Sequence, residues 1–338
     1  MNITRAINLK KYTTLKVGGD AEYFVSVSTQ EELLEAVLYA KKTELPITIL
    51  GGGSNVLVSD DGIKGLVVHI QLTGISQVVT DDAVLVTAQA GEALDAVVAY
   101  AVEKKLWGIE NLSHIPGSVG ATPVQNVGAY GVEVGDVIQS VTVFNCDTEA
   151  IEVLKRDVCN FAYRHSLFKT KEGKKYIIIS VTFALQSIAR PQLSYKDLQS
   201  YFIDNPQPSL EEIRRAVIII RAGKFPDWHE VGTAGSFFKN PTVTVFELES
   251  LIEKYPTLPS YAVDANHVKL PLGWILDTVL HLKGYKNGFI ETYQKQALVL
   301  VAHDGATATE IELFANAIIE KIKSETNILV DWEVTKLK

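Results

Sequence analysis

Residues 115–131 read IPGSVGATPVQNVGAYG, and this stretch decides the fold. It is too rich in glycine for regular structure, yet not polar enough for a flexible linker. Small side chains leave room for a flat ring system, while amides and hydroxyls can hydrogen-bond the polar edge of such a ring. We interpret the stretch as an ordered loop packed against a bound group. A purely structural loop is the alternative.

A second glycine-rich loop, Gly51-Gly52-Gly53-Ser54-Asn55, follows an expected strand at residues 46–50. Glycines let backbone N–H groups approach a pyrophosphate closely. The loop is not a Walker A motif, because no Gly-Lys-Ser/Thr follows, and Val56 stands where the third glycine of GxGxxG belongs. A simple turn explains this loop alone equally well. Two such loops that fit neither the Rossmann nor the P-loop rules favour a different cofactor fold.

Ser236, in GSFFKNP at residues 235–241, is a candidate reactive residue. The motif is not a GxSxG elbow, because Phe238 occupies the place of the second glycine. No histidine stands in an obvious triad arrangement, so we favour a proton donor over a nucleophile. A serine hydroxyl is a poor acid and would serve only an intermediate with carbanion or enolate character.

Two charged residues in apolar surroundings are further candidates. Arg164 follows an aromatic, apolar run, and its planar guanidinium could bind a carboxylate through paired hydrogen bonds. A surface arginine on a strand is the more common interpretation of such a residue. Glu333 lies on an expected final strand at residues 328–334. It is either an edge residue facing water or a buried, protonated carboxyl that donates a hydrogen bond.

Composition limits the class of protein. The chain has 338 residues, of which 47% are hydrophobic and 21% charged, as in globular proteins of about two domains. A net charge of -8 argues against a nucleic-acid partner. The cysteines, Cys146 and Cys159, form no CxxC pattern, and the 7 histidines show no metal spacing, so we expect no metal and no disulfide. Without a signal sequence or a membrane-spanning apolar run, we expect a cytoplasmic protein, with a monomer favoured.

Hydrophobic periodicity predicts an α+β chain. We expect strands at residues 21–27, 46–50, 65–70, 83–88, 140–144, 176–183, 296–301 and 328–334. Helices are expected around 33–38, 94–102, 209–221, 244–252, 272–282 and 307–322. Capping boxes are expected at four of the helix starts: Thr29 with Glu32, Ser209 with Glu212, Thr244 with Glu247, and Thr307 with Glu310. The break at residues 224–227 marks the main domain boundary.

Together these segments resemble one family, UDP-N-acetylenolpyruvoylglucosamine reductase, also called UDP-N-acetylmuramate dehydrogenase. The resemblance covers about residues 14–334. It rests on segments in a fixed order: TLKVGG at 14–19, ILGGGSN at 49–55, IPGSVGATPVQNVGAYG at 115–131, YRHSLFK at 163–169, GSFFKNP at 235–241 and DWEV at 331–334. It implies a cytoplasmic oxidoreductase of peptidoglycan synthesis that reduces the enolpyruvyl group of UDP-N-acetylglucosamine enolpyruvate with NADPH.

The resemblance also implies noncovalently bound FAD in an α+β fold similar to vanillyl-alcohol oxidase, with a smaller α/β substrate-binding domain. The FAD-binding region would be 1–224, with a core at about 17–188, completed by a C-terminal strand at 326–338. The substrate-binding domain would be 225–325. The residues that match FAD-binding positions are Leu50, Gly51, Gly52, Gly53, Ser54, Asn55, Ile115, Pro116, Gly117, Ser118, Gly120, Ala121, Gln125, Asn126, Gly128, Ala129 and Tyr130.

Site residues carry over in the same way. Arg164, Ser236 and Glu333 match the catalytic residues of the family. Positions expected to contact the UDP-sugar or NADPH are matched by Tyr163, Tyr195, Lys224, Asn240 and Gln296. The segment LSYKDL, which contains Tyr195, is similar to the mobile tyrosine loop found in the longer subtype of the family.

Two positions depart from the family pattern. Asp331-Trp332-Glu333 stands where the family usually has Glu-Pro-Glu, and Ala302 stands where asparagine is common. Two other functions stay open. One is a different flavin oxidase of the same fold, which would rarely use NADPH. The other is a non-catalytic UDP-sugar-binding protein, which would not require Arg164, Ser236 and Glu333.

Overall fold

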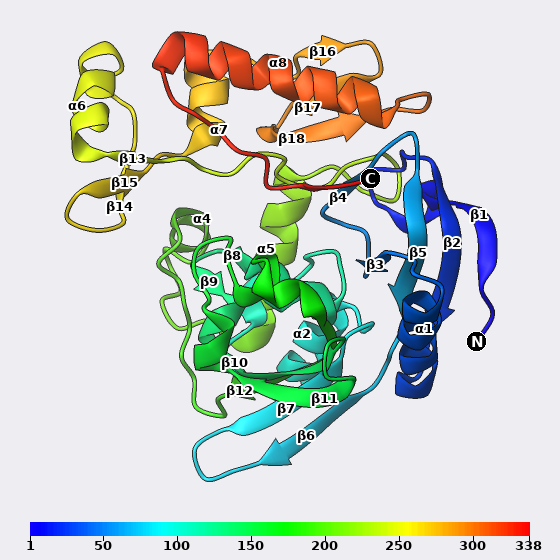
Figure 1. Ribbon diagram of the computed structural model, residues 1–338. Helices are drawn as coiled ribbons and strands as arrows, with labels where there is room; N and C mark the ends of the chain where they lie inside the picture. The colour runs from blue at the N-terminus through cyan, green and yellow to red at the C-terminus, as the bar shows by residue number, and fades with distance from the viewer. The chain divides into compact units, whose positions relative to one another are not determined.

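Residues 1–338 are described by a computed structural model, in which the chain divides into two units. The first unit consists of residues 1–7, 21–52 and 64–221, and the second of residues 8–20, 53–63 and 222–338. Both units mix helices with mostly antiparallel strands (Figure 1). The predicted α+β class is therefore confirmed.

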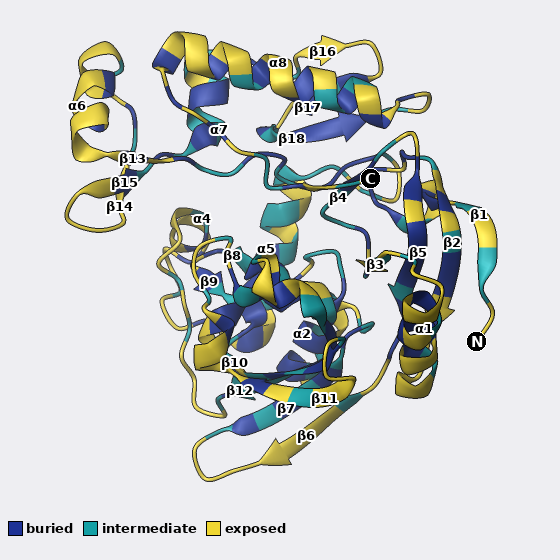
Figure 2. Ribbon diagram, viewed as in Figure 1, coloured by how far each residue is buried: buried dark blue, intermediate teal, exposed yellow.

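The largest sheet of the first unit has five antiparallel strands in the order β11-β10-β12-β7-β6. They are β6 (Ile75–Val79), β7 (Val84–Gln89), β10 (Ile138–Asn145), β11 (Ala150–Lys155) and β12 (Tyr176–Leu185). Buried and partly exposed residues alternate along β7, as the two faces of a pleated strand require. Helix α2 (Leu94–Glu103) contributes Leu94, Val97, Val98 and Ala101 to the same core as Phe183 of β12. Figure 2 shows this buried interior.

A second sheet in this unit has the order β1-β2-β5-β3. Its strands are β1 (Thr4–Asn8), β2 (Asp20–Val27), β3 (Ile47–Leu50) and β5 (Ile63–Ile70), and helix α1 (Gln30–Lys42) follows β2. Thr29 caps α1 as expected, because its Oγ1 accepts a hydrogen bond from Glu32 N–H. The expected reciprocal hydrogen bond, from Thr29 N–H to the Glu32 carboxylate, does not form. Glu32 Oε2 accepts from Ser28 N–H instead, so the predicted capping box is wrong in this half. The remaining elements are α3 (Thr122–Gln125), β8 (Gly128–Ala129), β9 (Val132–Glu133), α4 (Lys196–Tyr201) and α5 (Leu210–Lys224).

The second unit is built around helix α8 (Ala308–Thr326), whose Ile311, Phe314, Ile318 and Ile322 lie in its core. The other elements are β4 (Val56–Val58), β13 (Thr242–Thr244), α6 (Val245–Lys254), β14 (Tyr261–Ala262), β15 (His267–Lys269), α7 (Leu272–Trp274), β16 (Lys286–Asn287), β17 (Ile290–Tyr293), β18 (Gln296–Ala302) and β19 (Thr335–Leu337). The sheets are β13-β15-β14, β16-β17-β18 and β19-β4.

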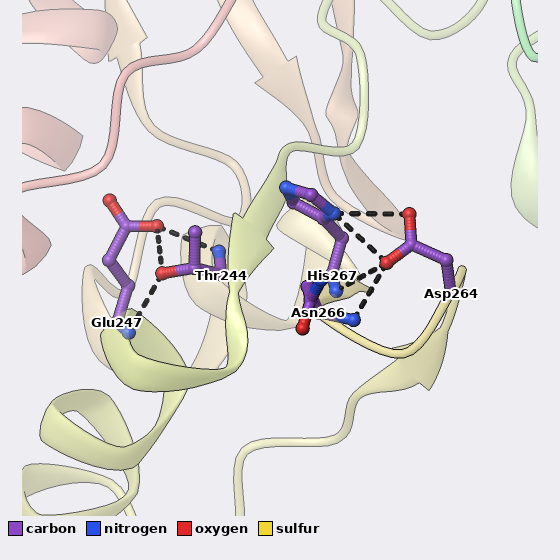
Figure 3. Close-up of polar contacts among 5 residues, drawn as sticks. All are labelled: Thr244, Glu247, Asp264, Asn266 and His267. Carbon is purple, nitrogen blue, oxygen red and sulfur yellow. Dashed lines mark hydrogen bonds and ion pairs between the residues drawn. The ribbon is translucent and has the colours of Figure 1, made fainter.

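Three predicted capping pairs are confirmed. Thr244 with Glu247 and Thr307 with Glu310 form reciprocal capping boxes at α6 and α8. Ser209 and Glu212 exchange the same two hydrogen bonds ahead of α5. Figure 3 shows the Thr244 box beside His267, whose ring Nδ1 lies 3.0 Å from each carboxylate oxygen of Asp264.

Two predicted elements are wrong. The helix expected at residues 272–282 is only the short α7 followed by a π-helical turn at Ile275–Val279. The final strand expected at 328–334 is not a strand. Its backbone instead bonds to residues 237–239, with Glu333 N–H donating to Phe237 O at 2.8 Å and Lys239 N–H to Asp331 O at 3.0 Å. The strand that does form, β19, begins only at Thr335, just after the predicted one ends, and it pairs in parallel with β4.

The bounds of the two units differ from those of the expected FAD-binding and substrate-binding domains. Residues 53–63 and 326–338 both lie in the second unit, where β4 and β19 join them. The assignment of FAD and substrate to particular domains therefore stays a prediction. No helix is both long enough and apolar enough to cross a membrane.

Asp95 of α2 forms the best-defined ion pair of the first unit, and it predicts a pH dependence. Arg214 of α5 donates to both carboxylate oxygens, at 2.6 and 2.9 Å, and His114 N–H donates at 2.5 Å. Burial alone would raise the pKa of Asp95, but these hydrogen bonds hold the pKa below its ordinary value. The stabilisation is therefore complete above the unfolded-state pKa and is lost as the pH falls through the folded-state pKa.

We expect Asp95→Asn to lower the free energy of unfolding by about 1 kcal/mol at neutral pH. The difference from the parent should shrink as the pH falls below 3.8, the ordinary pKa of the carboxyl. Urea unfolding at neutral pH and near pH 3 measures both values. Asp82→Asn, an exposed change between β6 and β7, is the control. A destabilisation that does not change with pH would contradict the ion-pair explanation.

Candidate functional site

The two glycine-rich loops meet within the first unit. Gly52 N–H donates to Ser118 Oγ at 3.2 Å. A Cβ on Gly51 would lie 2.3 Å from that oxygen, and one on Gly52 would lie 2.9 Å from Gly117 Cα. The Gly52 contact is to backbone atoms that cannot rotate away, so this position requires glycine to bring the two backbones together. Gly51 leaves room for the Ser118 hydroxyl.

Loop 115–131 is ordered, as expected, but the prediction that it lacks regular structure is wrong, because it contains α3 and β8. Buried polar bonds order the part between them. Asn126 has a left-handed backbone, with φ 44°, and a buried side chain. Its Nδ2 donates to Glu133 Oε2 at 2.7 Å and to Ala162 O at 3.0 Å, while its Oδ1 accepts from Gly135 N–H. The loop therefore holds a single shape, which also positions the hairpin containing Ala162.

Tyr130 lies near the end of this loop and is buried. Its ring packs edge-on against Tyr195, with the ring centroids 5.2 Å apart. Burial raises the pKa of Tyr130 to about 12, although the guanidinium of Arg221 acts in the opposite direction. The phenol is therefore neutral at physiological pH and available as a hydrogen-bond donor.

Arg164 is the second of the two central residues of a tight turn that is closed by the backbone hydrogen bonds between Ala162 and His165. Its φ of 51° lies in the left-handed region, which arginine seldom adopts. Its Nη2 lies 3.4 Å from Gly128 O. Lys169 Nζ donates to Arg164 O at 3.2 Å and to Gln125 Oε1 at 2.8 Å. The turn thus places a half-buried guanidinium beside loop 115–131.

Ser236 and Glu333 lie close together in the second unit. Ser236 pairs with Val299 of β18, and the adjacent Phe237 accepts a hydrogen bond from Glu333 N–H. Glu333 O accepts from Asn55 Nδ2 at 3.3 Å, and Asn55 O accepts from Thr335 N–H at 3.0 Å. Ser236 and Glu333 are both partly buried. The unit thus joins three distant segments, including the end of the first glycine-rich loop.

Trp332, which departs from the family pattern, packs into this part of the second unit. It pairs with Phe238, and its ring meets Phe237 edge-on at 5.0 Å between centroids. The aromatic contact takes the position that proline has in the family pattern. Ala302, the other departure, is buried at the end of β18 and bonded through its backbone to Gly232.

The residues expected to contact substrate are divided between the units. Tyr163 and Tyr195 belong to the first unit and are both exposed, at 36% and 44%. Lys224, Asn240 and Gln296 belong to the second. Asn240 Oδ1 accepts from Leu272 N–H at the start of α7, and Gln296 Oε1 accepts from Leu298 N–H. Asn240 therefore has a structural bond of its own. The meeting of these residues with one another, and of Arg164 with Ser236 and Glu333, stays a prediction.

Sequence reasoning missed the residues that support loop 115–131 from outside. Arg221 Nε donates directly to His114 O at 3.1 Å. Arg214 acts indirectly, because it holds the Asp95 carboxylate that accepts from His114 N–H. The signal was the spacing of two arginines seven apart on α5, which places them on one helix face. Asn111, which is fully buried, carried no such signal.

Known proteins match the chain along its length. A family model described as FAD binding domain matches residues 21–154, and one described as UDP-N-acetylenolpyruvoylglucosamine reductase, C-terminal domain, matches residues 227–337. The UDP-N-acetylenolpyruvoylglucosamine reductase of Neisseria gonorrhoeae is 40% identical over 315 residues, which are 92% of this chain and 90% of that protein. The chain belongs to the UDP-N-acetylenolpyruvoylglucosamine reductase family.

Further relatives of the same name agree with this membership. The Flavobacterium johnsoniae reductase is 37% identical over 338 residues, which are 99% of each chain. The crystal structure of the Thermus caldophilus reductase is 25% identical and covers 100% of both chains, with a TM-score of 0.69. The predicted family is confirmed, and the chain is an FAD-dependent oxidoreductase.

The residues present suit FAD. Gly51, Gly52 and Gly117 form a cradle without side chains where the two loops meet, and a Cβ on Gly51 or Gly52 would meet Ser118 or Gly117 of the second loop. Ser118, Gln125 and Asn126 add polar groups in the same loop as Gly117. The individual FAD contacts predicted above remain predictions.

A single methyl group tests the cradle. We expect Gly52→Ala to lower the affinity for FAD by about a hundredfold, because the added Cβ meets backbone atoms of Gly117 and Ser118 that cannot rotate away. Flavin fluorescence on dilution of the purified protein measures the dissociation. Gly223→Ala is the matched control, since a Cβ there meets nothing within 4 Å. If both variants retained FAD equally well, the contact between Gly52 and residues 117–118 would not be needed for FAD binding.

Proposed function

We propose that this reductase transfers hydride from NADPH to the enolpyruvyl double bond of UDP-N-acetylglucosamine enolpyruvate, forming UDP-N-acetylmuramate. The reaction would take place in the cytoplasm and supply peptidoglycan precursor synthesis. The observation that carries the proposal is the backbone arrangement that puts Ser236, Glu333 and loop residue Asn55 together in the second unit. Family membership over nearly the whole chain supports the substrate and the hydride donor.

Bound FAD would supply the hydride chemistry, accepting hydride from NADPH and delivering it to the methylene carbon of the substrate. The protein must then stabilise the negative charge that spreads onto the substrate carboxylate as an enolate forms. Arg164 is suited to this, because a guanidinium offers two parallel, charge-assisted hydrogen bonds to a carboxylate. The Glu333 carboxyl would contribute a further hydrogen bond.

Ser236 would protonate the carbon next to the carboxylate and so complete the reduction. Its hydroxyl is a weak acid, but an enolate carbon is a strong enough base to accept the proton. Lys239 follows closely in the same segment, and its Nζ lies 3.9 Å from an Asp331 carboxylate oxygen. Its positive charge would favour loss of the serine proton.

The remaining residues would bind substrate. Tyr163, Tyr195, Lys224, Asn240 and Gln296 would contact the UDP-sugar or NADPH. Lys224 offers a cation for the diphosphate, and the two exposed tyrosines offer hydroxyls and ring faces. Asn240 keeps its amide nitrogen for a ligand, because the bond to Leu272 N–H uses its oxygen.

An absorbance experiment on the purified holoenzyme tests the function. We expect a flavin spectrum that is bleached by NADPH without oxygen and restored by UDP-N-acetylglucosamine enolpyruvate, with one UDP-N-acetylmuramate formed per flavin. Bleaching that the UDP-sugar does not reverse would overturn the proposal. A flavin that NADPH does not bleach would indicate an oxidase of another kind, and UDP-sugar binding without turnover a binding protein.

A further inference from the structure

Asn111 joins two segments that lie far apart in the sequence. It is in a short 3-10 turn, Glu110–Leu112, just ahead of loop 115–131, and it is completely buried. Its Nδ2 donates to Tyr130 O and to Gln192 O, each at 2.8 Å. Tyr130 ends the second glycine-rich loop, while Gln192 belongs to the segment that leads to Tyr195.

The orientation of this amide follows from its partners. Both neighbours are carbonyl oxygens, which only accept, so the nitrogen must face them. The Oδ1 is then left buried without a hydrogen-bond partner. A buried acceptor without a partner is unfavourable and calls for an explanation. Joining the two carbonyls provides one.

Further contacts hold the same two segments together. The ring of Tyr195 packs edge-on against Tyr130 at an interplanar angle of 78°. A Cβ on Gly131 would lie 3.3 Å from Ser194 Oγ and 4.0 Å from Tyr195 Cβ, so the backbone there lies directly against the Tyr195 segment. Residues 192–195 form no helix or strand of their own. Their position therefore depends on side-chain contacts of this kind.

We propose that Asn111 is a positioning residue, which holds residues 192–195 against the end of loop 115–131 and so sets the affinity for the UDP-sugar. The proposal rests on the proposed function, in which Tyr195 contacts that substrate. Asn111 would touch neither substrate nor FAD and would act only through the segment that it holds. Its loss should therefore affect substrate binding more than hydride transfer.

The test uses the FAD-loaded Asn111→Ala and Asn111→Asp variants. Alanine removes the amide, and aspartate keeps its shape but turns an acceptor toward the two carbonyls. We expect hydrogen–deuterium exchange of the peptide covering residues 187–195 to become faster in both. The KM for UDP-N-acetylglucosamine enolpyruvate should rise about tenfold, the equivalent of roughly one lost hydrogen bond. The KM for NADPH and kcat should not change. If one variant fails to fold, the other decides.

Asn145→Ala is the matched control. Asn145 is also buried in the first unit, and its Nδ2 donates to Glu152 Oε1 at 2.7 Å, within the β10–β11 pair. Unchanged exchange at 187–195 in both Asn111 variants, or equal changes in the Asn145 variant, would overturn the proposal. The exchange measurement needs no turnover. It therefore distinguishes failure of the positioning role from failure of the proposed function, which would appear as an inactive parent enzyme.

Discussion

Replacing Ser236 by alanine should stop reduction of the UDP-sugar while leaving reduction of the flavin by NADPH intact. We expect the second half-reaction to slow by about 100-fold to 1,000-fold, the usual cost of removing one group that acts in the transition state. Only that half-reaction needs a proton on the substrate carbon. Stopped-flow absorbance of the flavin follows each half-reaction separately in a single preparation.

Two variants sharpen the Ser236 experiment. Ser236→Cys keeps a proton donor at the same position and should recover part of the lost rate. Ser250→Ala removes an exposed hydroxyl from α6 of the same unit and should change neither half-reaction. Equal slowing of both half-reactions in Ser236→Ala would remove Ser236 as the proton donor. It would point instead to a disturbed segment, because the following Phe237 and Phe238 are completely buried.

Local signals in the sequence predicted local structure. The pairs at Thr244, Thr307 and Ser209 mark true helix starts, because a cap is formed by residues three apart. The glycines of the two loops were expected to let the backbone approach a pyrophosphate, which stays a prediction. The structure shows that the loops also touch each other. Ser236 and Glu333 were candidates from their surroundings and matched catalytic positions by resemblance. The structure bonds Glu333 N–H to Phe237, the neighbour of Ser236, and the catalytic roles stay predictions.

Contacts between segments that lie far apart in the chain could not be predicted from the sequence in the same way. Apolar alternation at residues 328–334 predicted a strand, but the hydrogen bonds of that backbone go to residues 237–239. Nothing local in either segment encodes that pairing. The parallel contact of β4 with β19 joins segments almost a whole chain apart. For the same reason the buried Asn111 could not be identified, because its importance lies in two carbonyls brought to it by the fold.

Arg164 combines an unfavourable backbone conformation with a proposed role in catalysis, and substitution can separate the two. Glycine is the residue best suited to its φ of 51°. We therefore expect Arg164→Gly to leave the free energy of unfolding within about 1 kcal/mol of the parent. Reduction of the UDP-sugar should nevertheless fall by about 1,000-fold, because the enolate would lose its guanidinium partner.

The Arg164→Lys variant tests whether stabilisation of the substrate carboxylate needs only a positive charge or also the planar guanidinium. Lysine keeps the charge but cannot form two parallel hydrogen bonds to one carboxylate, so we expect about a hundredfold loss in the same half-reaction. Stopped-flow rates and urea unfolding give the two quantities for each variant, and Arg215→Lys, at an exposed position on α5, is the control. If Arg164→Gly kept its rate, or lost stability in proportion to activity, Arg164 would be a turn residue without a part in the chemistry. A fully active Arg164→Lys would mean that charge alone suffices, and the carboxylate clamp would have to be given up.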